Sequence, residues 1–144
     1  IAVALSLNII LTEHRAPQSL VEFMQSYISS PAMFMLLVNI LLLIVGCLMT
    51  TGEAILVLAP LLAPIAESYG YNKVLFGLIM ILNLEIGYLT PPVGINLIVA
   101  MGAFKQNFGV LCRAAVPFIL IMMICLIIVI WQPWIAMYLV TGKF

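Results

Sequence analysis

The sequence NLEIGYLTPPVGINLIV, residues 83–99, interrupts an apolar segment that extends from residue 74 to residue 104. Pro91 disfavours the α conformation at the residue before it, so we expect the first helix to stop near Leu89. Threonine is a good N-cap, and proline is tolerated as the first residue of a helix. We therefore expect a second helix to begin with Thr90 as its cap and Pro91 as its first residue. The stretch predicts one discontinuous helix.

The composition places this helix in a membrane. Of the 144 residues, 66% are hydrophobic and 7% are charged, whereas a soluble domain carries about 25% charged residues. A chain of this size cannot bury so many apolar side chains in one core, so we expect an all-α integral membrane protein surrounded by a lipid bilayer. The net charge is zero, so no basic surface suggests nucleic acid as a partner. Cys47, Cys112 and Cys125 share no CxxC spacing, and we expect buried, inert thiols.

Residues 32–66 are predicted to form a re-entrant helical hairpin. The apolar run 32–49 is followed by the polar TTGE, and the second apolar piece, 54–66, is shorter than the roughly 20 residues that a membrane span needs. Pro60 and Pro64 lie on one face of this second arm and should bend it. A separate crossing by the second arm is therefore doubtful.

The remaining segments complete the organisation of the chain. Because Ile1 lies inside an apolar run, we interpret the chain as part of a longer polypeptide. We divide it into three parts. Residues 1–31 contain the end of a membrane helix (1–11) and an interfacial amphipathic helix (18–30). Residues 32–104 contain the hairpin 32–66 and the broken helix 74–104, and residues 105–144 contain a polar connection (105–113) and a final transmembrane helix (114–131).

The two interruptions, GCLMTTGE (46–53) and GYLTPPVG (87–94), share the order Gly, Thr, apolar helix. Irregular backbone at membrane depth survives only where it is buried in protein or lines a cavity. The half-helix before the second interruption should end with free carbonyls from Glu85 to Tyr88. With the Thr90 hydroxyl, these oxygens would suit a small cation.

The start of the second half-helix should have the opposite preference. Its N–H groups near Val93 and Gly94 favour an anion, although we expect the Thr90 hydroxyl to accept the N–H of Val93. Transporters with discontinuous helices use both kinds of helix end. An ordinary proline kink is the alternative interpretation, but two prolines beside Gly and Thr make it less attractive.

The hairpin tip contains further candidates. Thr50 and Glu53 fit a capping box, in which the two side chains satisfy each other's backbone N–H groups. The functional alternative for Glu53 is a carboxylate beside a cation or substrate. Gly46 and Gly52 permit close backbone approach or a positive φ.

Several polar residues lie at membrane depth. Glu85 is about 18 Å along the helix from Lys73, and it is either buried between helices or part of a site. For Asn83 and Asn96, a hydrogen bond between helices and a role in a site are both open. We expect Asn39 to contribute to packing.

The stretch 83–99 resembles the signature NLEIGxxTPPVGxNLxV of the large membrane subunit of TRAP transporters, the tripartite systems that depend on a periplasmic binding protein. GCLM and AILVLAPLLAPIA, within 46–66, are similar to the hairpin that precedes this signature. VPF (116–118), a long apolar helix and WQPW (131–134) fit the family's C-terminal end. The resemblance covers nearly the whole chain.

The resemblance implies a sodium-coupled, multi-pass permease of the bacterial inner membrane that imports organic acids such as C4-dicarboxylates or sialic acid. Its partners would be a periplasmic substrate-binding protein and a small four-helix membrane subunit, and it would need no cofactor beyond sodium as the coupling ion. This chain would be the second of two inverted repeats in an elevator-type transporter. Residues 32–104 would belong to the transport domain, and 105–113 would lie in the cytoplasm.

Carried over from the family, the sodium site would consist of Gly46, Thr50 and Thr51 at the tip and Gly87, Thr90 and Gly94 at the break. Many members have an acidic residue where Thr50 stands, so either Glu53 compensates or the site relies on neutral oxygens. The further candidates for binding sodium or substrate are Gly52, Glu53, Asn83, Glu85, Pro91, Pro92 and Asn96.

The alternative function is a channel-like or structural membrane subunit without ion coupling. A channel needs a pore lined along its length, whereas two broken helices suggest a closed site. A structural subunit would not need the broken backbone. We do not expect an enzyme, because the sequence has no Asp and its single histidine, His14, lies outside the apolar runs.

Overall fold

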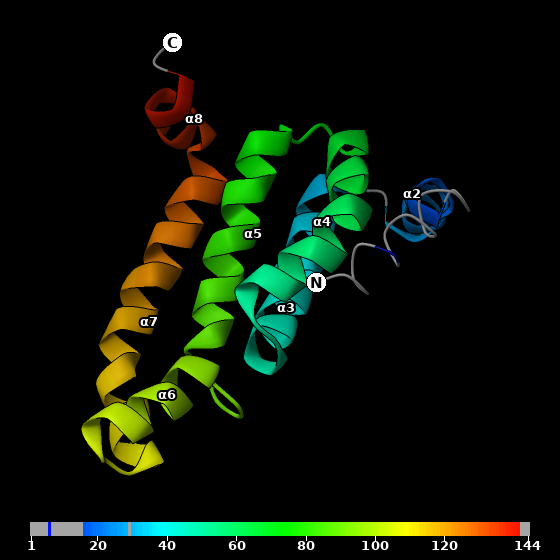
Figure 1. Ribbon diagram of the computed structural model, residues 1–144. Coiled ribbons are helices and arrows are strands. Elements are labelled where there is room, and N and C mark those ends of the chain that lie inside the picture. Colours follow the sequence, from blue (N-terminus) through cyan, green and yellow to red (C-terminus); the bar gives the residue numbers. More distant parts are fainter. Residues whose placement is uncertain (1–5, 7–15, 29, 142–144) are drawn as a thin grey trace.

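The computed structural model describes residues 6, 16–28 and 30–141, and within these ranges the chain is helical with no β-strand (Figure 1). The helices are α2 (Ala16–Tyr27), α3 (Pro31–Leu48), α4 (Thr51–Ser68), α5 (Lys73–Tyr88), α6 (Ile95–Phe104), α7 (Phe108–Trp131) and α8 (Pro133–Thr141). The helix end predicted at 1–11 lies outside the described residues apart from Ser6. The all-α prediction is confirmed for the described part of the chain.

Helix α4 is longer than the sequence predicted. It has 18 residues, because the polar residues 51–53 form its first turn and the helix continues to Ser68. Like α3 and α7, it is long and apolar enough to cross a membrane. The prediction that this second arm is too short for a separate crossing is therefore wrong. Pro60 and Pro64 lie within α4, both on its exposed side.

The C-terminal helices also differ from the prediction. Helix α7 begins at Phe108 rather than near residue 114, so the connection after α6 is only 105–107. Lys105 ends α6 with a positive φ of 51°. After α7 the chain turns at Gln132 into α8, which the sequence did not predict.

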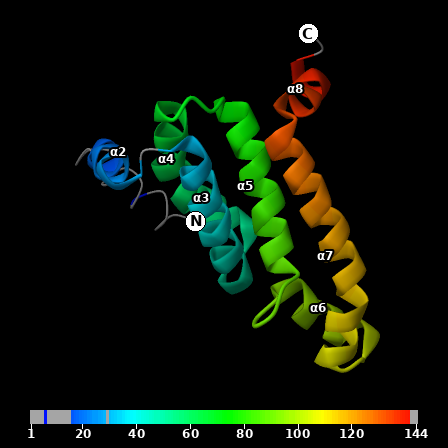
Figure 2. The ribbon, with the colours of Figure 1, turned by 180° about the vertical axis from the view of Figure 1, so that it is seen from behind.

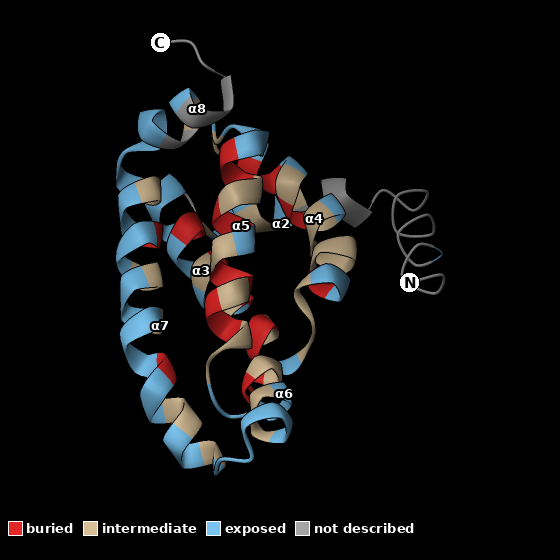
Figure 3. Cartoon of the chain, turned by 60° about the vertical axis from the view of Figure 1, so that its left-hand side comes forward, coloured by how far each residue is buried: buried red, intermediate tan, exposed pale blue. Residues whose placement is uncertain are grey.

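Helix α5 lies at the centre of the structure. It packs against both arms of the hairpin, α3 and α4, and against α7. Figure 3 shows buried residues along α5. Apolar residues of α3 at helical spacing, Phe34, Val38 and Leu42, meet buried residues such as Phe76 and Ile79 of α5. Burial of these side chains on both helices fixes how the hairpin sits on the broken helix.

Polar contacts join the start of α3 to the loop between α4 and α5. The Tyr69 hydroxyl donates to the Ile28 carbonyl, and the Tyr71 hydroxyl donates to the Pro31 carbonyl at 3.2 Å. The Tyr69 ring stacks on Phe34 with centroids 4.6 Å apart. Burial raises the pKa of Tyr71 above its usual range. These contacts place both outer ends of the hairpin at one end of the molecule.

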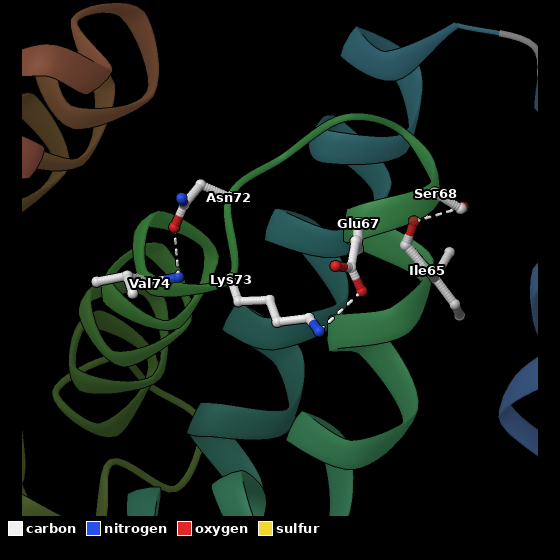
Figure 4. Close-up of polar contacts among 6 residues, drawn as sticks. All are labelled: Ile65, Glu67, Ser68, Asn72, Lys73 and Val74. Atoms are coloured by element: carbon white, nitrogen blue, oxygen red, sulfur yellow. Dashed lines mark hydrogen bonds and ion pairs between the residues drawn. The ribbon is translucent and has the colours of Figure 1, made fainter.

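The same loop is closed by two local interactions (Figure 4). The Asn72 side chain caps α5 by accepting the Val74 N–H at 2.8 Å, and Lys73 forms an ion pair with Glu67 at 2.9 Å. Both charged side chains are more than half exposed, so the pair contributes little to stability. Asparagine at the cap determines where α5 begins.

The two interruptions lie at the same level of the molecule. In Figure 1 the turn between α3 and α4 lies beside the loop between α5 and α6, while the turn from α6 to α7 lies further down. The view from behind shows the same order (Figure 2). The hairpin therefore turns back before it reaches the end of the structure that the 105–107 connection occupies.

Candidate functional site

Two glycines bring the hairpin tip and the break together. A Cβ atom at Gly46 would lie 2.7 Å from the Leu84 carbonyl oxygen, and one at Gly87 would lie 2.7 Å from the Leu43 carbonyl oxygen and 2.8 Å from Gly46 Cα. No side chain fits at either position without moving backbone. Small residues allow this kind of close helix approach in membranes. The close approach that the sequence permitted at Gly46 is thus confirmed, and Gly87, for which no such approach was predicted, is its partner.

Gly52 has a different environment. A Cβ there would have no atom within 4 Å, and its φ is not positive. Gly52 therefore uses neither the close backbone approach nor the positive φ that glycine permits, and it is an exposed residue in the first turn of α4.

Side chains of the hairpin tip also contact α5 and the break. The Thr51 hydroxyl donates to Glu85 Oε1 at 2.9 Å, which links the first turn of α4 to α5. The Cys47 thiol lies 3.9 Å from the Pro91 carbonyl oxygen. A cavity of about 270 Å³ between tip and break includes Cys47, Pro91 and Pro92 in its mostly apolar wall. Glu85 is thus partly buried between helices and at the same time beside the tip.

The break itself differs from the prediction. Helix α5 ends at Tyr88 with Leu89 as its C-cap, as predicted, but α6 begins at Ile95 with Gly94 as its cap. Thr90 and Pro91 therefore do not start the second helix. The physical reason is the second proline: Pro91 itself precedes a proline, so the α conformation is disfavoured there too. Gly94 has a φ of 53°, a left-handed conformation that glycine adopts readily.

The hydrogen bonds at the end of α5 also correct the expected oxygen site. The Thr90 hydroxyl donates to the Ile86 carbonyl at 2.6 Å instead of accepting from Val93. The Thr90 N–H bonds the Gly87 carbonyl at 2.8 Å, and the Leu89 N–H is shared between the carbonyls of 85 and 86. Of the four carbonyls predicted to be free, only that of Tyr88 has no hydrogen-bond partner within the described ranges.

The prediction that N–H groups at the start of the second half-helix favour an anion also applies to the observed start of α6. Among the described residues, no acceptor is found for the N–H groups of Val93, Gly94, Ile95 and Asn96. Four unpaired N–H groups at a helix N-terminus favour a negative group. Asn96 lies partly buried in this first turn.

The hairpin tip contains the predicted capping box. Thr50 Oγ1 accepts the Glu53 N–H at 3.4 Å, and Glu53 Oε2 accepts the Thr50 N–H at 3.3 Å. The Glu53 carboxylate is therefore committed to the helix end and exposed. Glu85 is the carboxylate that reaches the tip from the neighbouring helix.

The asparagines join α3 to α5. Asn83 is fully buried and donates to Asn39 Oδ1 and to the Ile79 carbonyl, while Asn39 donates to the Met35 carbonyl. For Asn83, the structure thus supports the hydrogen bond between helices. Both asparagines stand out in the sequence as polar residues in apolar runs, but only the structure pairs them.

The described residues include no group of three or more His, Cys, Asp or Glu side chains suited to hold a metal ion. A cation in this region would therefore depend on hydroxyl and carbonyl oxygens and on Glu85. Such hard, mostly neutral oxygens suit an alkali cation better than a transition metal.

Residues 1–135 match the family model described as the tripartite ATP-independent periplasmic transporter, DctM component. The chain belongs to this DctM family. It is therefore part of a multi-pass membrane permease of a TRAP transporter, and not an enzyme.

Three similar proteins illustrate the family. The C4-dicarboxylate TRAP transporter large permease protein DctM of Vibrio cholerae is 40% identical over 98% of this chain and 31% of its own length. The isethionate TRAP transporter permease protein DctMQ of Oleidesulfovibrio alaskensis is 37% identical over 90% of this chain and 20% of its length. The sialic acid permease SiaM of Vibrio cholerae is 35% identical over 86% of this chain and 29% of its length. The chain thus spans less than a third of the length of these relatives.

Proposed function

We propose that this chain is the second-repeat part of a sodium-coupled permease that imports organic acids across the bacterial inner membrane. The observation that supports it most is the close contact of two helix interruptions, with Gly46 against Gly87 and Thr51 bonded to Glu85. Paired interruptions at membrane depth are the way secondary transporters build midplane sites. In this proposal α3 and α4 form a re-entrant hairpin and α5 and α6 form one discontinuous membrane helix, both moving together in an elevator-type transport domain.

The sodium site would lie where the tip meets the break. Its candidate ligands are oxygens of Gly46, Thr50 and Thr51 on the tip and of Gly87, Thr90 and Gly94 at the break. The Tyr88 carbonyl, which has no partner in the described part of the chain, is an additional candidate. The unpaired N–H groups at the start of α6 would face the carboxylate of the substrate.

The substrate class and partners are proposed from the relatives. Their names specify C4-dicarboxylates, isethionate and sialic acid, all of which are organic acids. A periplasmic binding protein would deliver the acid. The double designation DctMQ of one relative supports a small membrane subunit as second partner.

Uptake by the complete system would test this proposal. The full-length permease, its small subunit and its binding protein would be reconstituted in proteoliposomes, and uptake of labelled succinate, isethionate and sialic acid compared under sodium and potassium gradients. We expect at least one acid to accumulate only with sodium. Equal uptake with potassium would favour the channel-like alternative.

Thr90 provides a matched pair of variants for the same assay. Thr90→Ser keeps a hydroxyl that can bond the Ile86 carbonyl, whereas Thr90→Ala removes it. We expect sodium-dependent uptake to collapse in Thr90→Ala while membrane insertion persists, and to be retained in Thr90→Ser. Unchanged uptake in Thr90→Ala would argue against a site at the break.

A further inference from the structure

A groove runs between α3, α5 and α7 on the side of α5 away from α4. Its volume is about 420 Å³, and most of its wall is apolar. Leu36, Ile40 and Ile127 form part of its rim and are each about half exposed. Along α3 the wall extends from Ala32 to Leu43, roughly 16 Å at helical rise. The groove is therefore elongated along the helices, like the face that one helix offers to another.

An amide pair lies in this wall. Asn83 is fully buried, and both hydrogens of its Nδ2 are used by Asn39 and Ile79. Asn83 Oδ1 has no hydrogen-bond partner in the described part of the chain. Asn39, which is partly exposed to the groove, uses one of its two N–H groups on the Met35 carbonyl. Asn39, with its second N–H group, therefore offers the unused hydrogen-bonding capacity at the groove surface, and the unpaired Asn83 Oδ1 is buried next to it.

The depth of the pair restricts what can cover it. Asn83 lies ten residues beyond Lys73 in α5, about 15 Å along the axis, which is about half of the roughly 30 Å hydrocarbon core. Lipid headgroups do not reach this depth, and acyl chains offer neither donors nor acceptors. A polar side chain on a neighbouring membrane helix can supply both.

We propose that the groove is the docking site of a transmembrane helix from another part of the same permease polypeptide, with a hydrogen-bonding side chain (Ser, Thr, Asn, Gln or His) at the level of Asn39 and Asn83. The shared region is only 31% of the Vibrio cholerae relative's length, so most of such a permease lies outside the part described here. A helix of the same polypeptide is tethered near the groove at high effective concentration.

Site-specific photo-crosslinking in the full-length permease, expressed in membranes with its small subunit, tests this inference without depending on sodium or on uptake. A benzophenone amino acid would replace Ile127 at the groove rim or, as the control, Ile128. The control residue is 45% exposed, against 56% for Ile127, and lies outside the groove wall, about 100° around the helix.

We expect Ile127 to crosslink mainly to one peptide of the permease outside the 144 residues, and at least five-fold more efficiently than Ile128 does to that peptide. The same benzophenone at Ile40, across the groove, should give that peptide too. Mass spectrometry of the product should find a Ser, Thr, Asn, Gln or His within one turn of the crosslinked residue.

Three results would overturn the inference. Products with lipid alone would show that acyl chains fill the groove, and products with the small subunit would show that the partner is another chain. Equal yields of the same peptide from Ile127 and Ile128 would show that the contact is not specific to the groove.

Discussion

Removing the Thr51 hydroxyl should release the hairpin tip from the broken helix. The hydroxyl donates to Glu85 at 2.9 Å across partly buried surfaces. Hydrogen bonds to charged groups contribute about 1.5–3 kcal/mol in water-soluble proteins, but those between membrane helices average about 0.6 kcal/mol and reach about 1.7 kcal/mol. Because Glu85 is only partly buried, its unpaired carboxylate keeps some solvation. We therefore take about 1 kcal/mol, which corresponds to a roughly five-fold rise in the population of the released tip.

The native Cys47 thiol reports on this release. It is 8% exposed and lies at the tip against Pro91, so a small water-soluble thiol reagent should reach it mainly when the tip opens. When opening and closing are fast, the labelling rate follows the open population. In a protein with Cys112 and Cys125 replaced by Ala, we expect Thr51→Val to label about five times faster than the parent.

Two comparisons separate the hydrogen bond from other effects of the substitution. Thr51→Ser keeps the hydroxyl and should label at nearly the parental rate. Once Thr51 is Val, adding Glu85→Gln should change the rate far less than Glu85→Gln does alone, because the two groups share one interaction. Parental labelling in Thr51→Val, or independent effects in the double variant, would refute the assignment of this bond as the tie between tip and break.

Three further predictions concern packing, capping and topology. Gly87→Ala should lower the melting temperature in detergent, because its Cβ would meet the α3 backbone at 2.7 Å and overpacking costs about 1–3 kcal/mol. The control Gly77→Ala, in the same helix with open space around it, should be neutral or stabilising. Equal melting temperatures of the two variants would contradict the close contact. Glu53→Ala should lower thermal stability slightly and leave the sodium dependence of uptake unchanged, because the Glu53 carboxylate caps α4. A large loss of sodium affinity in this variant would instead show that Glu53 is a sodium ligand. Cysteines introduced at Ser68 and Gln106 in a background without native cysteines should be labelled from opposite sides of the membrane, the second from the cytoplasm, and labelling of both from one side would contradict the proposed topology.

Local features of the sequence were sufficient for several parts of the fold. The membrane class follows from composition, because 7% charged residues cannot cover a soluble domain of this size. The end of α5 near Leu89 and the capping box of Thr50 and Glu53 were predicted correctly. Both depend on backbone preferences within four residues, which the sequence displays directly.

The start of α6 shows where local rules conflicted. Thr90 and Pro91 form a good helix start when considered alone, but Pro92 removes the α conformation from Pro91. The helix starts instead after Gly94, and the Thr90 hydroxyl bonds back to α5. The oxygens expected to be free are thereby mostly occupied, so the local error carried through to the predicted site.

Only the tertiary structure decided which residues face one another. Thr51 and Glu85 are 34 positions apart, and Asn39 and Asn83 are 44 apart. The sequence marks each as a polar residue in an apolar run, but one face of a helix can be turned toward any neighbour. The contact of Gly46 with Gly87 sets the register of α3 on α5, because neither position leaves room for a side chain. In the same arrangement Asn39 lies opposite Asn83, and the first turn of α4 reaches Glu85.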